Sequence, residues 1–190
     1  MKIIAILAMA AVTARASDLT VYVQDRSSFP TANLGRAERL ANKIFAGAGV
    51  KIDWRTGGPR HWQLKRERAI AVEMVDRTPS REMPGALAFA LPYEGVHITV
   101  FYDRVERAAE FCLSPNDLLA HVLVHEITHL LEGISRHSET GIMKPHWTLQ
   151  DVRGMRRRPL AFTEEDAELI RTGLARREDG GALVSAGATY

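Results

Sequence analysis

The sequence contains one cysteine, Cys112, among 190 residues. A single cysteine cannot form a disulfide within the chain, and it cannot supply the cysteine pairs of a zinc ribbon. We therefore expect Cys112 to pack as a small buried side chain, in a protein that is neither a disulfide scaffold nor a cysteine-based metal module.

No apolar run is long enough to cross a bilayer, which takes about 20 residues. The run Ile3–Val12 covers ten residues. It follows Lys2 and precedes the small-x-small triplet Ala14–Ala16, an order that is typical of a secretory signal peptide. We predict that residues 1–16 are a signal peptide cleaved after Ala16, and that the mature protein is secreted or periplasmic without a membrane span.

Neither sign of charge is in excess. The chain has 25 basic and 23 acidic residues, a net charge of +2. Loss of Lys2 and Arg15 with the signal peptide would leave 23 of each and a net charge of 0. We expect no nucleic-acid partner, because a neutral chain offers no basic surplus to bind one. Internal repeats and the GxGxxG, Walker and GxSxG motifs are also missing from the sequence.

What is present is an alternation of strand and helix signals. Apolar residues at helical spacing cover Thr31–Ala48, between the first two predicted strands. Strand, helix and strand indicate a crossover unit with parallel strands, and the last two strands indicate a hairpin. Runs rich in β-branched and apolar residues predict the strands Asp18–Gln24, Val50–Trp54, Ala69–Val75, Ala86–Leu91 and Val96–Tyr102.

The most informative stretch is Ser114–Met143. Ser114 can cap a helix, Pro115 suits its first position, and Gly133 can end it in a left-handed conformation. Between them, apolar residues at helical spacing form a broad surface. The pattern predicts a largely buried helix of about five turns.

Two histidines share one face of that helix, because His125 and His129 are four residues apart. Two imidazoles so placed can chelate one zinc ion, and Glu126 beside them can take a proton from a water whose pKa the metal lowers to about 7. This is the HExxH arrangement, here HEITH. Because so short a motif also arises by chance, the interpretation needs a third ligand.

His137 follows the helix and its glycine and is the predicted third ligand, which leaves one position on zinc for water. His146 is the runner-up, and Glu132 or Glu139 would complete a different set. His121 lies one turn before HEITH, but the eight residues from His121 to His129 rise about 12 Å along the helix, too far for one ion. We interpret His121 as a packed or supporting histidine.

At these residues the chain resembles the metzincin clan of zinc endopeptidases, in which a glycine, a third histidine and a methionine in a tight turn beneath the metal follow the zinc helix. The resemblance implies that His125, His129 and His137 bind one zinc ion, that Glu126 is the general base, and that Met143 is the turn methionine. The spacing differs, because LLEGISR places seven residues between the second and third histidines where the usual pattern has five.

The same resemblance implies where a substrate would lie. Gly85–Pro92 is similar to the strand at the sheet edge over the active site, to which an extended peptide could add. Lys144–Gly154, expected as a loop or short turn, would help to line the pocket. The implied substrate-binding residues are Ala86, Leu87, Ala88, Phe89, His146 and Trp147.

The end of the chain predicts a last helix, capped by Thr163–Asp166 and ending near Arg177. We expect residues 17–178 to form one catalytic domain and residues 179–190 a flexible tail. The predicted fold class is α+β, zincin- or metzincin-like. It combines a small twisted mixed sheet with a long zinc-binding helix, a methionine turn and a C-terminal helix.

The predicted function is that of a secreted, monomeric zinc metalloprotease, a hydrolase whose substrate is a peptide or protein. A zinc amidase acting on cell-wall peptides would use the same groups. A binding module in which zinc only stabilises the fold would keep the ligands without turnover. In a metal-free fold the histidines would merely pack.

Overall fold

The first strand, helix and second strand form the expected crossover unit. In the computed structural model, β1 (Ser17–Arg26) and β2 (Val50–Thr56) pair in parallel, joined by α1 (Thr31–Phe45) and a short 3-10 helix, η1 (Ala46–Ala48). Gly49 makes the turn into β2 at φ 76°, in the left-handed region that favours glycine. The structure describes residues 17–28, 30–60, 69–76, 85–91, 96–110 and 114–186.

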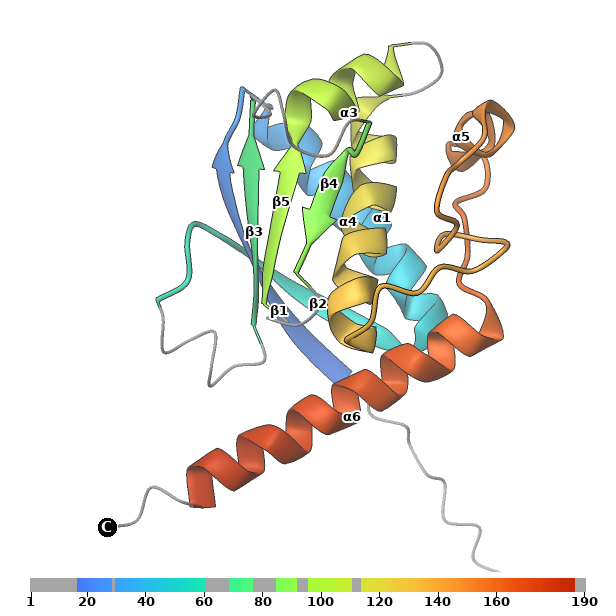
Figure 1. The fold of residues 1–190 in the computed structure, drawn as a ribbon. Coiled ribbons are helices and arrows are strands. Elements are labelled where there is room, and N and C mark those ends of the chain that lie inside the picture. The colour runs from blue at the N-terminus through green and yellow to red at the C-terminus, as the bar shows by residue number, and fades with distance from the viewer. Residues whose placement is uncertain are drawn as a thin grey trace, which may run out of the picture.

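Three further strands complete a mixed five-stranded sheet in the order β2-β1-β3-β5-β4. β3 (Ile70–Val75) and β5 (His97–Phe101) continue the parallel part, and β4 (Ala88–Ala90) pairs antiparallel with β5. The predicted hairpin is therefore confirmed. β4 is an edge strand and lies beside the helix that carries HEITH (Figure 1).

That helix is α4 (Pro115–Glu132), which follows α3 (Tyr102–Ala109) along the chain. Pro115 stands at its start, and Gly133 ends it at φ 70°, as the sequence predicted. α4 packs against α1, α3, β4 and the last helix, so that nearly its whole length is buried. Leu119, Leu123 and Ile127 have no exposed surface. The prediction of a largely buried helix is confirmed.

The start of α4 differs from the prediction in one respect. Ser114 holds the capping position with extended backbone, but its side chain makes no capping hydrogen bond. The hydroxyl is turned toward the side chain of Asn116 instead. The start signal therefore comes from Pro115, whose φ suits the first turn, and from Asp117, whose charge meets the positive helix end.

The segment after Met143 was predicted to be a loop or short turn, and it contains a helix, α5 (Leu149–Met155). Thr148 and Asp151 form a reciprocal capping box: the Thr148 hydroxyl accepts from the Asp151 N–H at 3.2 Å, and the Asp151 carboxylate accepts from the Thr148 N–H at 2.8 Å. This cap starts a helix too short to show an apolar stripe, which is why the sequence did not predict it.

The last helix, α6 (Glu164–Ala186), crosses the C-terminal end of α4 (Figure 1). Gly173 permits this approach, because a Cβ there would lie 1.7 Å from the Leu131 carbonyl oxygen. The predicted end near Arg177 is wrong, and residues 179–186 of the predicted tail continue the helix. Glycine in a helix costs about 1 kcal/mol relative to alanine, which weakens a helix without ending it.

Three predictions fall wholly or partly on residues that the structure does not describe. These are the signal peptide, residues 1–16, the packing of Cys112, and the last part of the predicted tail, residues 187–190. Among the described residues, no helix is both long and apolar enough to cross a membrane.

Candidate metal centre

Three histidines meet at the C-terminal half of α4. His125 and His129 lie on the helix with their Nε2 atoms 3.1 Å apart, and His137 comes from the segment that follows Gly133. One ligand nitrogen from each ring lies within 4.8 Å of the other two. Within the described part of the chain, this is the one such group of histidine, cysteine and acidic residues that could hold a metal ion.

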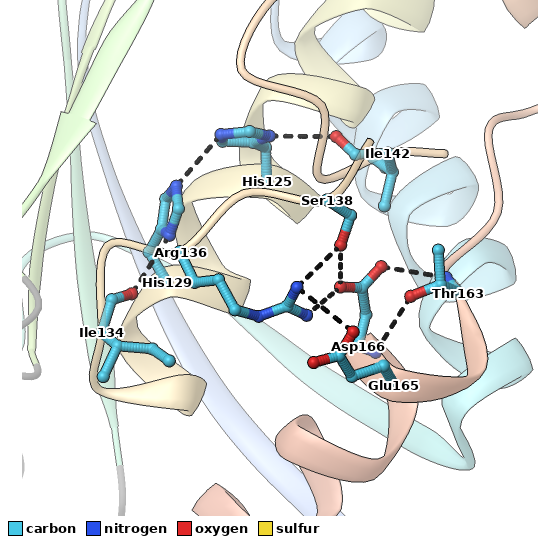
Figure 2. A network of polar contacts seen from close by, with 9 residues as sticks. All are labelled: His125, His129, Ile134, Arg136, Ser138, Ile142, Thr163, Glu165 and Asp166. Atoms are coloured by element: carbon cyan, nitrogen blue, oxygen red, sulfur yellow. Dashed lines mark hydrogen bonds and ion pairs between the residues drawn. The ribbon is translucent and has the colours of Figure 1, made fainter. Parts of the chain in front are cut away.

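Backbone carbonyls orient the two helical histidines (Figure 2). His125 Nδ1 lies 3.0 Å from the Ile142 carbonyl oxygen, and His129 Nδ1 lies 3.3 Å from that of Ile134. A carbonyl only accepts, so each Nδ1 carries the proton and donates it. Each Nε2 then presents a lone pair, and the two lone pairs converge on one point. The pair is preorganised for a cation.

The electrostatics favour neutral imidazoles, the form that binds metals. Burial, with smaller contributions from the neighbouring His125 and His137, lowers the pKa of His129 to about 4. The pKa of His125 is lowered, chiefly by burial. Burial also lowers the pKa of His137, with smaller contributions from His146 and Arg136.

Glu126 points from α4 toward the edge strand. Burial raises its pKa to about 7, and a backbone hydrogen bond from Ala90 acts in the opposite direction. Ala90 is the last residue of β4. The carboxyl group therefore lies between the histidine cluster and the sheet edge, in surroundings that make it a better proton acceptor than an exposed glutamate.

His121 is not part of the cluster. It is fully buried, its Nδ1 lies 2.7 Å from the Asp117 carbonyl oxygen, and its Nε2 accepts from the Leu160 N–H at 3.1 Å. Both ring nitrogens are thus used within the protein, and the prediction of a packed histidine is confirmed. The carboxylates of Glu132 and Glu139 and the ring of His146 also lie outside the cluster.

The turn that contains Met143 lies directly behind His125. The Ile142 carbonyl that orients His125 also accepts from Trp147 Nε1 at 3.1 Å, and the Trp147 ring packs edge-on against His125. Gly141 is needed for this turn, because it has φ 76° and a Cβ there would lie 2.4 Å from the Ala161 carbonyl oxygen. Met143 itself is 1% exposed.

The segment that carries His137 is fastened to α6 by Asp166 (Figure 2). Arg136 and Ser138 flank the histidine, and both donate to Asp166 Oδ1, at 2.6 and 2.5 Å. Asp166 has no exposed surface, and its Oδ2 accepts from the Thr163 N–H at 2.9 Å. Burial alone would raise the pKa of Asp166, but hydrogen bonds from Ser138 and Thr163 bring it below its ordinary value.

Asp166 is the residue near the site whose role the sequence did not indicate. It was assigned only to the cap of the last helix, a role it does have, because its N–H donates to the Thr163 hydroxyl at 3.1 Å. Nothing local indicates its second set of contacts, because Asp166 and Ser138 are 28 positions apart in the chain.

A groove of about 1460 Å³ runs past the cluster. α4 contributes Leu118, Val122, His125, Glu126 and His129 to its lining. The rest is formed by α3, β4, α5 and the segment between α4 and α5. The residues predicted to bind substrate all line this groove: Ala86, Leu87, Ala88, Phe89, His146 and Trp147.

The edge strand directs part of its backbone toward this groove. The Leu87 carbonyl accepts from Phe101, and the Leu91 N–H donates to His97, so these residues pair with β5. Because pairing alternates along an antiparallel strand, the backbone groups of Ala88 and Ala90 point away from β5. One of these outward groups, the Ala90 N–H, is the donor to Glu126.

The mixed sheet with its long histidine-bearing helix defines an α+β fold of the zincin type. Among solved structures, that of an archaemetzincin from Methanopyrus kandleri matches with a TM-score of 0.56, over 87% of this chain and 100% of that one, at 15% sequence identity. At this identity the match shows the fold alone. No family model and no curated protein matches this chain in sequence.

Proposed function

We propose that this protein is a zinc-dependent metallopeptidase whose ion is held by His125, His129 and His137. The observation that carries the proposal is the convergence of three histidines beside Glu126, along a groove bordered by the edge strand β4. The likeness to the archaemetzincin fold supports it.

The histidines fit zinc in spacing and in chemistry. Two nitrogens about 2.0 Å from a tetrahedral zinc lie about 3.3 Å apart. The Nε2 atoms of His125 and His129, 3.1 Å apart, come close to that value. Three neutral imidazoles leave one position open, which is typical of catalytic zinc. Zinc in such a site supplies a Lewis acid and lowers the pKa of a bound water to about 7.

Glu126 is the general base in this proposal. Its carboxylate takes a proton from the attacking water and then passes it to the leaving amine. The Ala90 N–H holds that carboxylate against the sheet edge. An extended peptide beside β4 would pair with the outward N–H and C=O of Ala88, which brings its backbone along the groove past Glu126.

The remaining parts have supporting roles. Met143 forms the buried base of the turn behind His125, and Trp147 packs against that ring. The extra residues between His129 and His137 do not displace the third histidine, because Arg136 fastens this segment to Asp166.

Zinc content decides the ligand set. We expect about one zinc per mature wild-type chain and little in His137→Ala, with His146→Ala as the matched control that keeps its metal. Loss of zinc from His146→Ala alone would assign the third ligand to His146 instead. Absence of zinc from the wild type would overturn the proposal.

Measurements of hydrolysis distinguish a peptidase from an amidase and from a non-catalytic module. We expect Glu126→Gln to keep zinc and to lose peptide hydrolysis by several orders of magnitude, because the proton acceptor is gone. Hydrolysis of peptidoglycan peptides but not of proteins would identify the amidase. A wild type that binds zinc and hydrolyses neither class of substrate would be the non-catalytic module.

We also propose that residues 1–16 direct export and that cleavage follows Ala16. The charged start, apolar run and small-x-small triplet support this. Amino-terminal sequencing of the exported protein should begin at Ser17. Retention of Met1 in a chain that stays inside the cell would contradict it.

A further inference from the structure

The charged side chains that line the groove are mostly basic. Four basic side chains belong to its lining, Arg104, Arg107, Lys144 and Arg153, whereas Glu126 is the one acidic residue among the described residues that line it. The residues after position 16 contain 23 basic and 23 acidic residues, so the imbalance is local to the groove.

Three of the four basic residues belong to α3 and α5, which lie toward the end of the groove at which α4 begins (Figure 1). Arg104 and Arg107 come from α3 and Arg153 from α5, whose residues line the groove together with Leu118 and Val122 of α4. Leu118 lies seven residues before His125, which is about 10 Å along a helix. This end is therefore about two or three substrate residues away from the histidine cluster.

Two of the four basic side chains already interact with groups of the protein. Lys144 pairs with Asp151 at 2.5 Å, and Arg104 donates to the Ala86 carbonyl at 2.6 Å. Arg107 is only loosely held, since it lies 3.7 Å from Asp103 with 69% of its side chain exposed. Arg153 is exposed and has no ion pair with any described residue.

The direction of β4 decides which part of a substrate reaches this end. β4 runs from Ala88 toward Ala90, whose N–H donates to Glu126, and Ala86, two residues before β4, accepts from Arg104 of α3. A peptide that pairs antiparallel with β4 therefore runs from Glu126 toward α3. Its residues on the C-terminal side of the scissile bond would lie between α3 and α5.

We propose that Arg107 and Arg153 form a subsite for a substrate carboxylate on the C-terminal side of the scissile bond. The inference rests on the proposed peptidase function and specifies its substrate class. Guanidinium groups bind carboxylates through paired N–H donors, and a concave groove strengthens their field. The carboxylate belongs either to an aspartate or glutamate side chain or to the C-terminus of a short substrate.

Matched peptides test the subsite and separate the two sources. One set differs by Glu or Gln at the first, second or third position after the scissile bond, and another carries a free or an amidated C-terminus. We expect kcat/KM to be about tenfold higher for the acidic member of at least one pair, the value of one charge-assisted contact. Equal rates in every pair would overturn the proposal.

Variants assign the preference to the named residues. Arg107→Gln and Arg153→Gln should each lower the ratio of acidic to neutral kcat/KM, and the double variant should bring it close to one. Arg157→Gln is the matched control, because Arg157 follows α5 and is exposed but does not line the groove. A ratio that stays at the wild-type value in the double variant would also overturn the proposal.

A binding measurement separates this inference from the proposed function. Zinc-loaded Glu126→Gln is titrated with the same peptides carrying a fluorescent label. Tighter binding of the acidic members, lost in the double arginine variant, would support the subsite even if the wild type hydrolyses nothing. Equal binding of the acidic and neutral peptides, or no binding, would overturn the subsite. The proposed peptidase function would not be affected, because hydrolysis by the wild type tests it independently.

Discussion

Glu132, the last residue of α4, lies in surroundings that disfavour a charge. It is 4% exposed, and neither carboxylate oxygen has a hydrogen-bond partner among the described residues. Burial raises its pKa to about 7, although Arg136 acts to lower it. The folded protein therefore keeps a proton on Glu132 at pH values where the unfolded chain, with an ordinary pKa of 4.5, has released it.

This carboxyl makes folding stability fall as pH rises. Because the unfolded chain releases the proton first, the free energy of unfolding decreases from about pH 4.5 through about pH 7. Glu132→Gln should remove that part of the pH dependence and raise stability by about 1 to 3 kcal/mol at about pH 8. Urea unfolding in a chelator measures this pH dependence, with the exposed Glu168→Gln as control. The prediction would be contradicted if the free energy of unfolding decreased with pH to the same extent in the wild type and in Glu132→Gln.

The turn behind His125 requires glycine at position 141. Replacement of Gly141 therefore tests how much this turn contributes to stability. Gly141→Ala should cost about 1 to 3 kcal/mol from the left-handed backbone, and more from the contact with the Ala161 carbonyl. Gly57→Ala is the control, since Gly57 also has a positive φ, 102°, but no atom within 4 Å of the added Cβ. Thermal unfolding compares them. Equal losses in the two variants would show that the Ala161 contact does not matter.

At the scale of elements, α6 determines where the third histidine lies. α4 supplies His125 and His129 by its own periodicity, but His137 is in an irregular segment and depends on its neighbours. Arg136 and Ser138 tie both sides of it to Asp166. A buried carboxylate with charge-assisted hydrogen bonds provides a stiff attachment.

Asp166→Asn should therefore weaken metal binding more than it weakens the fold. We expect zinc affinity to fall about 10- to 100-fold, the usual effect of removing a group that supports a ligand. Competition with a chelating dye measures affinity, and the visible spectrum of the cobalt-loaded protein reports ligand geometry. Glu165→Gln, whose carboxylate is 70% exposed and 3.6 Å from Arg136, is the control. Unchanged affinity and spectrum in a destabilised Asp166→Asn would leave Asp166 with a structural role only.

At the scale of the whole molecule, the proposed ion joins α4 to the segment fastened on α6. A ligand that binds only the folded state stabilises it, by about 2.7 kcal/mol at a free concentration 100 times its Kd. A chelator should therefore lower the unfolding midpoint of the wild type and leave that of His129→Ala unchanged. Equal midpoints of the wild type with and without chelator would argue against a zinc ion that contributes to the fold.

The elements and the chemistry that depend on nearby residues could be predicted from the sequence. Helical periodicity placed His125, Glu126 and His129 on one face, Gly133 ended α4, and the strand signals produced the crossover unit and the hairpin. These are effects of backbone geometry over a few residues, so they can be read locally. The capping box of α5 was equally local, and it was missed because the helix is too short to show an apolar stripe.

Contacts between distant segments could not be predicted in this way, and they are known from the folded structure. It brought His137 to His125 and His129, excluded Glu132 and His146 from the cluster, joined Glu126 to Ala90, and tied Ser138 to Asp166 on α6. The charge pattern of the groove also arose there, because α3 and α5 are far apart in the chain. Such contacts follow from how helices and strands pack against one another, and no spacing along the sequence specifies that packing.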